Sequence, residues 1–111
     1  MTPEGKVKAE IKRILTKHSA YYFMPQPGFT CRSGIPDFIC CVNGHFLAIE
    51  AKAESKQPTA LQQQELDKIT AVGGIGVCIN IDNIATLDTL INGLKTKRFG
   101  ASFSSYIVDY K

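Results

Sequence analysis

The sequence predicts an α/β fold in which a mixed β-sheet is flanked by helices, in the order α-β-β-β-α-β-α. Two observations carry this prediction. Two apolar runs are joined by Asn43-Gly44, the strongest short signal for a two-residue hairpin turn, which predicts an antiparallel pair. A third apolar run, residues 75–81, follows a helical pattern ended by Gly73-Gly74 and therefore predicts a strand reached by a crossover helix.

The first element is a helix that begins at Thr2-Pro3-Glu4, with Thr as N-cap, Pro at the first position and Glu in the first turn. Its buried stripe consists of four apolar residues at helical spacing: Val7, Ile11, Ile14 and Leu15. Residues 21–24 are predicted to form the first strand, which ends at the Pro- and Gly-containing residues 25–28. We expect the following loop, residues 29–34, to border a site, since such loops tolerate close approach by a ligand.

The hairpin strands are predicted at residues 38–42 and 46–49, and a helix at about 60–72. Residues 75–81, apolar except for Asn80, are predicted to form a continuous strand, as expected in a sheet interior. A last amphipathic helix carries Ile84, Leu87, Ile91 and Leu94. In the tail, residues 103–110 could form an added edge strand and could serve dimerisation.

Length and composition indicate one domain over residues 1–111, with a motif-bearing core at 3–82 and a C-terminal helix and tail at 83–111. The composition, 44% hydrophobic and 21% charged, is that of a globular protein. We expect a soluble cytoplasmic protein, because the sequence has neither a long apolar run nor a signal-peptide pattern. The cysteines lack metal-binding spacing and are predicted to be reduced: Cys31, Cys40, Cys41 and Cys78.

Two carboxylates stand at the open ends of the hairpin strands, which should bring Asp37 close to Glu50. Alternation along the strand directs Glu50 and Lys52 to one face. Mg²⁺ is bound in proteins through one or two carboxylates, and the Ala51 backbone carbonyl could add an oxygen. Lys52 could then orient or deprotonate the attacking water, or offset transition-state charge. An E-x-K triplet alone is more often a solvated ion pair, but the combination favours phosphodiester cleavage.

The motifs G-I-P-D at 34–37, E-A-K at 50–52 and P-T-A-L-Q at 58–62 resemble the VRR-NUC branch of the PD-(D/E)XK nuclease superfamily, in particular its small stand-alone phage and prophage type. The resemblance implies that Asp37 and Glu50 bind Mg²⁺ or Mn²⁺, that Lys52 is the catalytic lysine and that Gln62 opens the helix after the site. It also implies an acid on the first helix.

Glu4 fits that position and could bind the metal through water, since Val7 and Ile11 follow it at the family's spacing. Glu10 is the alternative, but its helical neighbours Arg13 and Lys17 should face solvent.

The resemblance implies a metal-dependent, structure-selective DNA endonuclease that cuts Holliday junctions. A junction offers two equivalent strands, so we expect a homodimer with two active sites. The alternatives are a nuclease that cuts flaps or duplex more broadly and a non-catalytic DNA-binding module. The net charge of +3 identifies DNA binding only weakly. The residues expected to contact DNA are Lys6, Lys12, Arg13, Arg32, Ser33 and Lys56.

Overall fold

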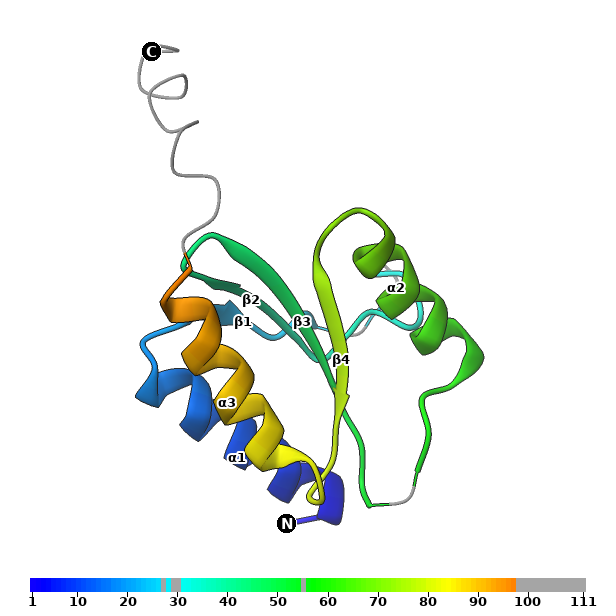
Figure 1. Cartoon of the computed structure of the whole chain (residues 1–111). Coiled ribbons are helices and arrows are strands. Elements are labelled where there is room, and N and C mark those ends of the chain that lie inside the picture. Colours follow the sequence, from blue (N-terminus) through cyan, green and yellow to red (C-terminus); the bar gives the residue numbers. More distant parts are fainter. Residues whose placement is uncertain (27, 29–30, 55, 98–111) are drawn as a thin grey trace.

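The computed structural model describes residues 1–26, 28, 31–54 and 56–97. Its elements are α1 (Pro3–Lys17), β1 (Tyr21–Phe23), β2 (Phe38–Val42), β3 (His45–Ala51), α2 (Ala60–Ala71), β4 (Ile75–Ile79) and α3 (Ile84–Lys95). The strands form one sheet in the order β1-β2-β3-β4, antiparallel except for the parallel pair β3 and β4. Helices α1 and α3 cover one face and α2 the other (Figure 1). The predicted fold class and element order are confirmed; the predicted tail strand lies outside the described residues.

The core lies between the sheet and the pair α1 and α3. The four predicted stripe residues of α1 are all buried, and they pack with alternate residues of β2 and β3. The helix starts as predicted, because the Thr2 hydroxyl accepts a hydrogen bond of 3.0 Å from the Gly5 N–H and satisfies a donor that the helix leaves free. No described helix is both long and apolar enough to cross a membrane.

The hairpin turn fixes the register of β2 and β3. Asn43 and Gly44 have φ values of 52° and 88°, and two successive positive φ angles are what a type I′ turn requires. The Asn43 amide also donates to the carbonyls of Leu94 and Lys95, at 3.1 and 2.9 Å. The hairpin therefore caps the C-terminus of α3 and is held against the rest of the fold.

β4 differs from the sequence prediction in length and position. It ends at Ile79 rather than residue 81, because the Asn80 side chain accepts hydrogen bonds from the N–H groups of Asp82 and Asn83 and so forms a turn. Within the sheet formed by the described residues it is an edge strand, not an interior one. Its residues Ile75, Val77 and Ile79 pack against the core on one face while α2 packs on the other, so the strand is as apolar as an interior one although most of it is only partly buried.

Helix α2 covers only part of its face of the sheet. It packs chiefly on β4 and β3, where glycines allow a close approach. A side chain at Gly76 would lie 2.8 Å from the Leu66 carbonyl oxygen, and one at Gly74 would lie 2.8 Å from the Ile69 side chain. The same face of β1 and β2 carries the exposed residues Tyr21, Phe23 and Cys41.

Candidate active site

Asp37 and Glu50 meet where the hairpin opens. In the β2–β3 ladder Phe38 pairs with Ile49, so one further step in the antiparallel register places Asp37 opposite Glu50. Asp37 is fixed there, because its Oδ2 accepts a hydrogen bond of 2.8 Å from the Ala51 N–H. The turn chemistry at the far end of the hairpin thus determines which two carboxylates face each other.

Glu50 is a carboxylate held in an apolar environment. Its residue exposure is 3%, and its Oε1 atom is buried without a hydrogen-bond partner among the described residues. Burial, and to a smaller extent the neighbouring Asp37 carboxylate, together raise the pKa of Glu50 from the usual 4.5 to about 8. A buried carboxylate oxygen without a partner destabilises the folded protein unless a cation or a proton binds to it.

Lys52 lies beside Glu50 on the same face of β3. Its Nζ is 3.8 Å from Glu50 Oε2, and its side chain is only 13% exposed. The Lys52 N–H donates to the Ile79 carbonyl on β4, so the backbone polar groups of Ala51 point the opposite way, toward Asp37. The Ala51 carbonyl is therefore directed to the side on which the two carboxylates meet.

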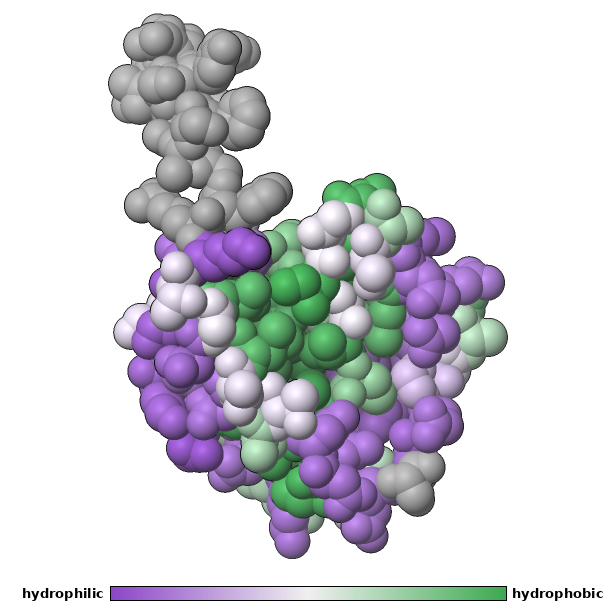
Figure 2. Space-filling view, viewed as in Figure 1, coloured by the Kyte–Doolittle hydropathy of each residue, from purple (hydrophilic) through white to green (hydrophobic). Residues whose placement is uncertain are grey.

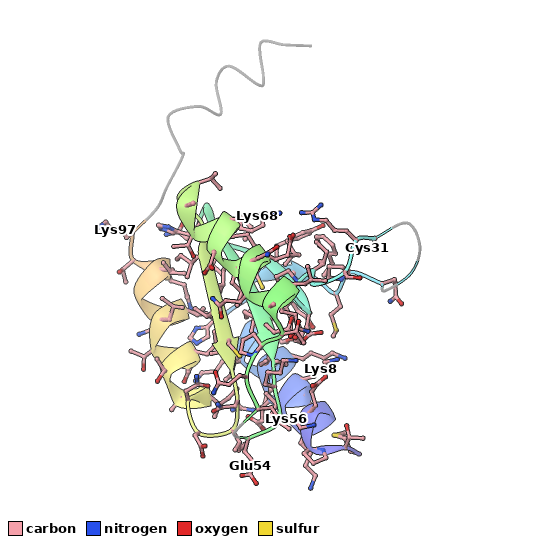
Figure 3. The ribbon with its side chains drawn as sticks, turned by 90° about the vertical axis from the view of Figure 1, so that its right-hand side faces the viewer. Lys8, Cys31, Glu54, Lys56, Lys68 and Lys97 are labelled. Atoms are coloured by element: carbon pink, nitrogen blue, oxygen red, sulfur yellow. The ribbon has the colours of Figure 1, made fainter. Side chains whose placement is uncertain are left out.

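The sequence analysis missed a second ammonium at this site. Lys8 Nζ lies 3.6 Å from Asp37 Oδ1 and 3.4 Å from Glu4 Oε2, and it bridges α1 to the end of β2. Burial lowers the pKa of Lys8, but the charges of Asp37 and Glu4 outweigh that effect and leave it raised. Figure 3 shows Lys8 on the side of the molecule where the loop that carries Cys31 projects. The available signal was helical spacing, since Lys8 follows Glu4 by four residues.

The two candidate acids of α1 have different surroundings. Glu4 reaches the site through Lys8, and its charge contributes weakly to the raised pKa of Glu50. Glu10 forms an exposed pair with Arg13, at 2.9 Å from the guanidinium. Arg13, expected to contact DNA, is thus bound to a carboxylate on the same helix. The catalytic role assigned to Glu4 stays a prediction.

Gln62 opens α2 as a capping residue. Its Oε1 accepts from the Thr59 N–H at 2.9 Å, while the Thr59 hydroxyl accepts from the Gln62 N–H at 3.2 Å, which is a complete capping box. The side-chain oxygen of Gln62 is therefore committed to the helix start. Its amide NH₂ has no hydrogen bond to the described residues and is the part able to reach a ligand.

The loop before Asp37 is anchored to α2 at two points. Gly34 has φ +89°, and a Cβ there would lie 2.7 Å from the backbone of Leu61, so only glycine allows this approach. The Arg32 guanidinium donates to both carboxylate oxygens of Glu65, at 3.0 and 2.9 Å. Hydrogen bonding from Arg32 lowers the pKa of Glu65. Arg32, expected to contact DNA, thus also holds the loop.

A pocket of about 420 Å³ opens beside Asp37, lined by Lys8, Asp37 and residues 24–26, 28 and 31–36. Arg32 and Ser33 contribute to its wall. The other residues expected to contact DNA are exposed and lie outside this pocket: Lys6, Lys12 and Lys56.

One solved structure, described as "VRR_NUC domain", matches this chain with a TM-score of 0.65. The match has 22% sequence identity and covers 78% of this chain and 95% of that one. The chain shares its fold with a VRR_NUC domain. The predicted VRR-NUC resemblance is therefore confirmed for the fold, while the phage or prophage type stays a prediction. No protein-family model matches the sequence, and no curated protein matches it.

On this VRR_NUC fold, the donor set is suited to a divalent cation with few protein ligands. No three His, Cys, Asp or Glu side chains among the described residues converge to hold a metal ion. The candidate ligands are Asp37, Glu50 and the Ala51 carbonyl. A cation bound here would supply a partner for the buried Glu50 Oε1 atom. Mg²⁺ uses such a set, because it keeps several waters and binds substrate phosphate.

Proposed function

We propose that this protein is a metal-dependent DNA endonuclease that hydrolyses phosphodiester bonds. The observation that carries the proposal is the pairing of Asp37 with a buried, orphaned Glu50 on adjacent strands, beside Lys52. A carboxylate whose pKa is strongly raised by burial and by a second carboxylate is characteristic of a functional site. The shared VRR_NUC fold supports membership of that nuclease family.

In this mechanism Asp37, Glu50 and the Ala51 carbonyl would hold Mg²⁺ or Mn²⁺. The cation, when bound, lowers the pKa of its water and neutralises phosphate charge. Lys52 donates from Nζ to the attacking water or to a phosphate oxygen, where positive charge stabilises the transition state. With a cation compensating the charge of Asp37, Lys8 would be free to bind a neighbouring phosphate.

The favoured substrate is a four-way DNA junction. A domain of this size carries one site, whereas a junction offers two equivalent strands, so we propose a homodimer. A surface able to form it runs over β4 and the adjacent side of α3, where hydrophobic side chains gather (Figure 2). The partly buried apolar residues there are Ile75, Val77, Ile84, Leu90 and Leu94. β4 carries no charge or proline that would discourage a second copy from pairing with it.

Cleavage of a substrate panel tests the function. A synthetic four-way junction, a flap, a splayed arm and plain duplex are incubated with Mg²⁺, with Mn²⁺ or with EDTA. We expect cleavage only with metal and the fastest cleavage for the junction. Equal cutting of all substrates would identify a broader nuclease, and binding without cutting under every condition would identify a non-catalytic DNA-binding module.

The matched control is Asp37→Asn. An asparagine oxygen can still accept from the Ala51 N–H, so the loop keeps its anchor while the negative charge is lost. We expect no cleavage and DNA binding at least as tight as that of the wild type, because the lost charge repelled phosphate.

A further inference from the structure

β1 exposes two aromatic side chains on the face of the sheet that carries the candidate site. Tyr21 is 72% exposed and Phe23 is 51% exposed. Their partners across the strand pair, Cys41 and Ile39, share this face. Alternation along β2 directs Ile39 to the same side as Asp37, two residues earlier. Large exposed aromatics side by side on a soluble protein are uncommon and indicate a binding surface.

The register determines how near these rings lie to the carboxylates. Phe23 pairs with Ile39, which makes it the diagonal neighbour of Asp37, at about 7–8 Å in an antiparallel sheet. Tyr21 lies two residues before Phe23 on the same face of β1 and pairs with Cys41. The two rings therefore form a row that leads away from the carboxylates across one continuous sheet face.

Helix α2 leaves this row uncovered, because it lies over β3 and β4. Phe46 shows the contrast. It is an exposed aromatic on the same face, but its ring lies against Gly74 and lines an apolar pocket with Ile69 and Val72. The rings of Tyr21 and Phe23 are the aromatic surface near the carboxylates that α2 does not cover.

The site beside this row carries exposed positive charge. Arg32 and Lys68 lie 2.9 and 3.7 Å from a single buried carboxylate, that of Glu65, and both cations are about two-thirds exposed. Two cations share one anion, so the cluster keeps a net charge of about +1. Lys8 lies between Asp37 and Glu4, which balance its charge, so the net positive charge comes from Arg32 and Lys68. Apolar rings next to exposed cations match the bases and phosphates of a nucleic acid strand.

We propose that Tyr21 and Phe23 form a stacking platform for unpaired nucleobases of the DNA strand adjacent to the phosphate that is cut. This inference rests on the proposed function and deepens it: the DNA bound at the site has unpaired bases beside the cleavage point, whether at the opened centre of a junction or in a single-stranded arm. Stacking tolerates any base, so the platform selects DNA structure rather than sequence. DNA is favoured over a second copy of the chain because the platform is continuous with the carboxylates and the cations, which a protein contact here would bury.

The test measures binding without cleavage, in EDTA, to a duplex with a single-stranded arm and to a fully paired duplex of equal length. The double variant Tyr21→Leu/Phe23→Leu keeps apolar area but removes both rings. We expect its affinity for the armed DNA to fall about tenfold or more, and its affinity for the duplex to stay within about twofold. Phe46→Leu, the matched control on the same face, should bind both DNAs like the wild type, and so should the conservative variant Tyr21→Phe.

A 2-aminopurine base in the arm gives a second readout. We expect its fluorescence to be quenched by the wild type and not by the double variant, with both proteins equally folded by circular dichroism. Equal losses on both DNAs, or no loss on the armed DNA, would overturn the platform. So would a change in oligomeric state of the double variant, which would identify the face as a protein interface. If the wild type bound neither DNA, the proposed function itself would fail.

Discussion

Glu50 is buried where the proposed chemistry needs a negative charge, so stability and function oppose each other at this residue. Its pKa of about 8 means that the folded, metal-free protein keeps a proton that the unfolded chain releases near pH 4.5. Stability of the metal-free protein should therefore fall as pH rises from about 4.5 to about 8, and stay low above that. A bound cation would remove this loss by compensating the charge.

The variant Glu50→Gln tests this opposition. At pH 8.5 without metal we expect the variant to be more stable than the wild type by on the order of 4–5 kcal/mol, and at pH 4 to be equal. Mg²⁺ should stabilise the wild type and not the variant, which should be inactive. Urea unfolding at the two pH values measures this. Glu54→Gln, a change at an exposed glutamate, is the control; a similar gain there would refute the role of burial.

A substitution at Gln62 can separate its role in capping α2 from a role in contacting substrate. Gln62→Glu keeps an oxygen that accepts from the Thr59 N–H, and it adds a negative charge near the positive end of α2. It loses the NH₂ donor. We expect unchanged or slightly higher thermal stability, and cleavage slower by about tenfold or more if the amide contacts substrate. Wild-type cleavage rates would assign Gln62 to helix capping alone.

At the residue scale, the sequence predicted the meeting of Asp37 and Glu50 because a two-residue turn leaves one register. It did not predict the ion pair of Lys8 with Asp37, since that contact depends on how α1 is rotated and placed against the sheet. The capping box of Gln62 follows from Thr59 three residues earlier, a local signal that is independent of the resemblance to nuclease motifs.

At the scale of elements, the loop before Asp37 is fitted to the start of α2 through Gly34. Gly34→Ala introduces both an unfavourable positive φ and a clash with the Leu61 backbone. Gly73→Ala, the matched control, introduces the unfavourable φ alone, because nothing lies within 4 Å of its Cβ position. The difference between the two variants therefore isolates the contact between loop and helix.

We expect Gly73→Ala to cost about 1–2 kcal/mol of stability with normal cleavage. Gly34→Ala should cost more and should lower cleavage by about 10², because a displacement of roughly 1 Å at Asp37 is enough for such a loss. Thermal unfolding and single-turnover cleavage measure the two effects. Equal activity of the two variants would show that the loop moves without displacing Asp37.

The elements themselves were predictable where a local signal exists. Thr2 and Thr59 mark helix starts, Asn43 and Gly44 the hairpin, and Gly73 the end of α2. The position of β4 in the sheet was not predictable, because an apolar strand with packing on both faces has the same composition at an edge as in the interior. The end of β4 depended on the side chains of Asn80 and Asn83, whose turn competes with continuation of the strand.

At the scale of the whole molecule, the proposed dimer follows from the symmetry of the substrate and from the hydrophobic surface over β4 and α3 (Figure 2). Leu90 is a partly buried residue on α3 in this region. Leu90→Glu would place a charge in a self-complementary interface twice, once from each copy, and should dissociate the dimer. Thr89→Glu adds the same charge at the neighbouring exposed position on α3 and is the control.

A supercoiled plasmid with an extruded cruciform reports both cuts. A dimer that cuts both strands within one binding event should give linear DNA, whereas a monomer should give nicked circles. We therefore expect linear product from the wild type and from Thr89→Glu, and nicked circles from Leu90→Glu, with sedimentation showing the matching change in mass. A Leu90→Glu protein that stays dimeric would place the interface elsewhere. A monomeric wild type that still yields linear product would contradict the link between dimerisation and paired cutting, because one site would then serve both strands in turn.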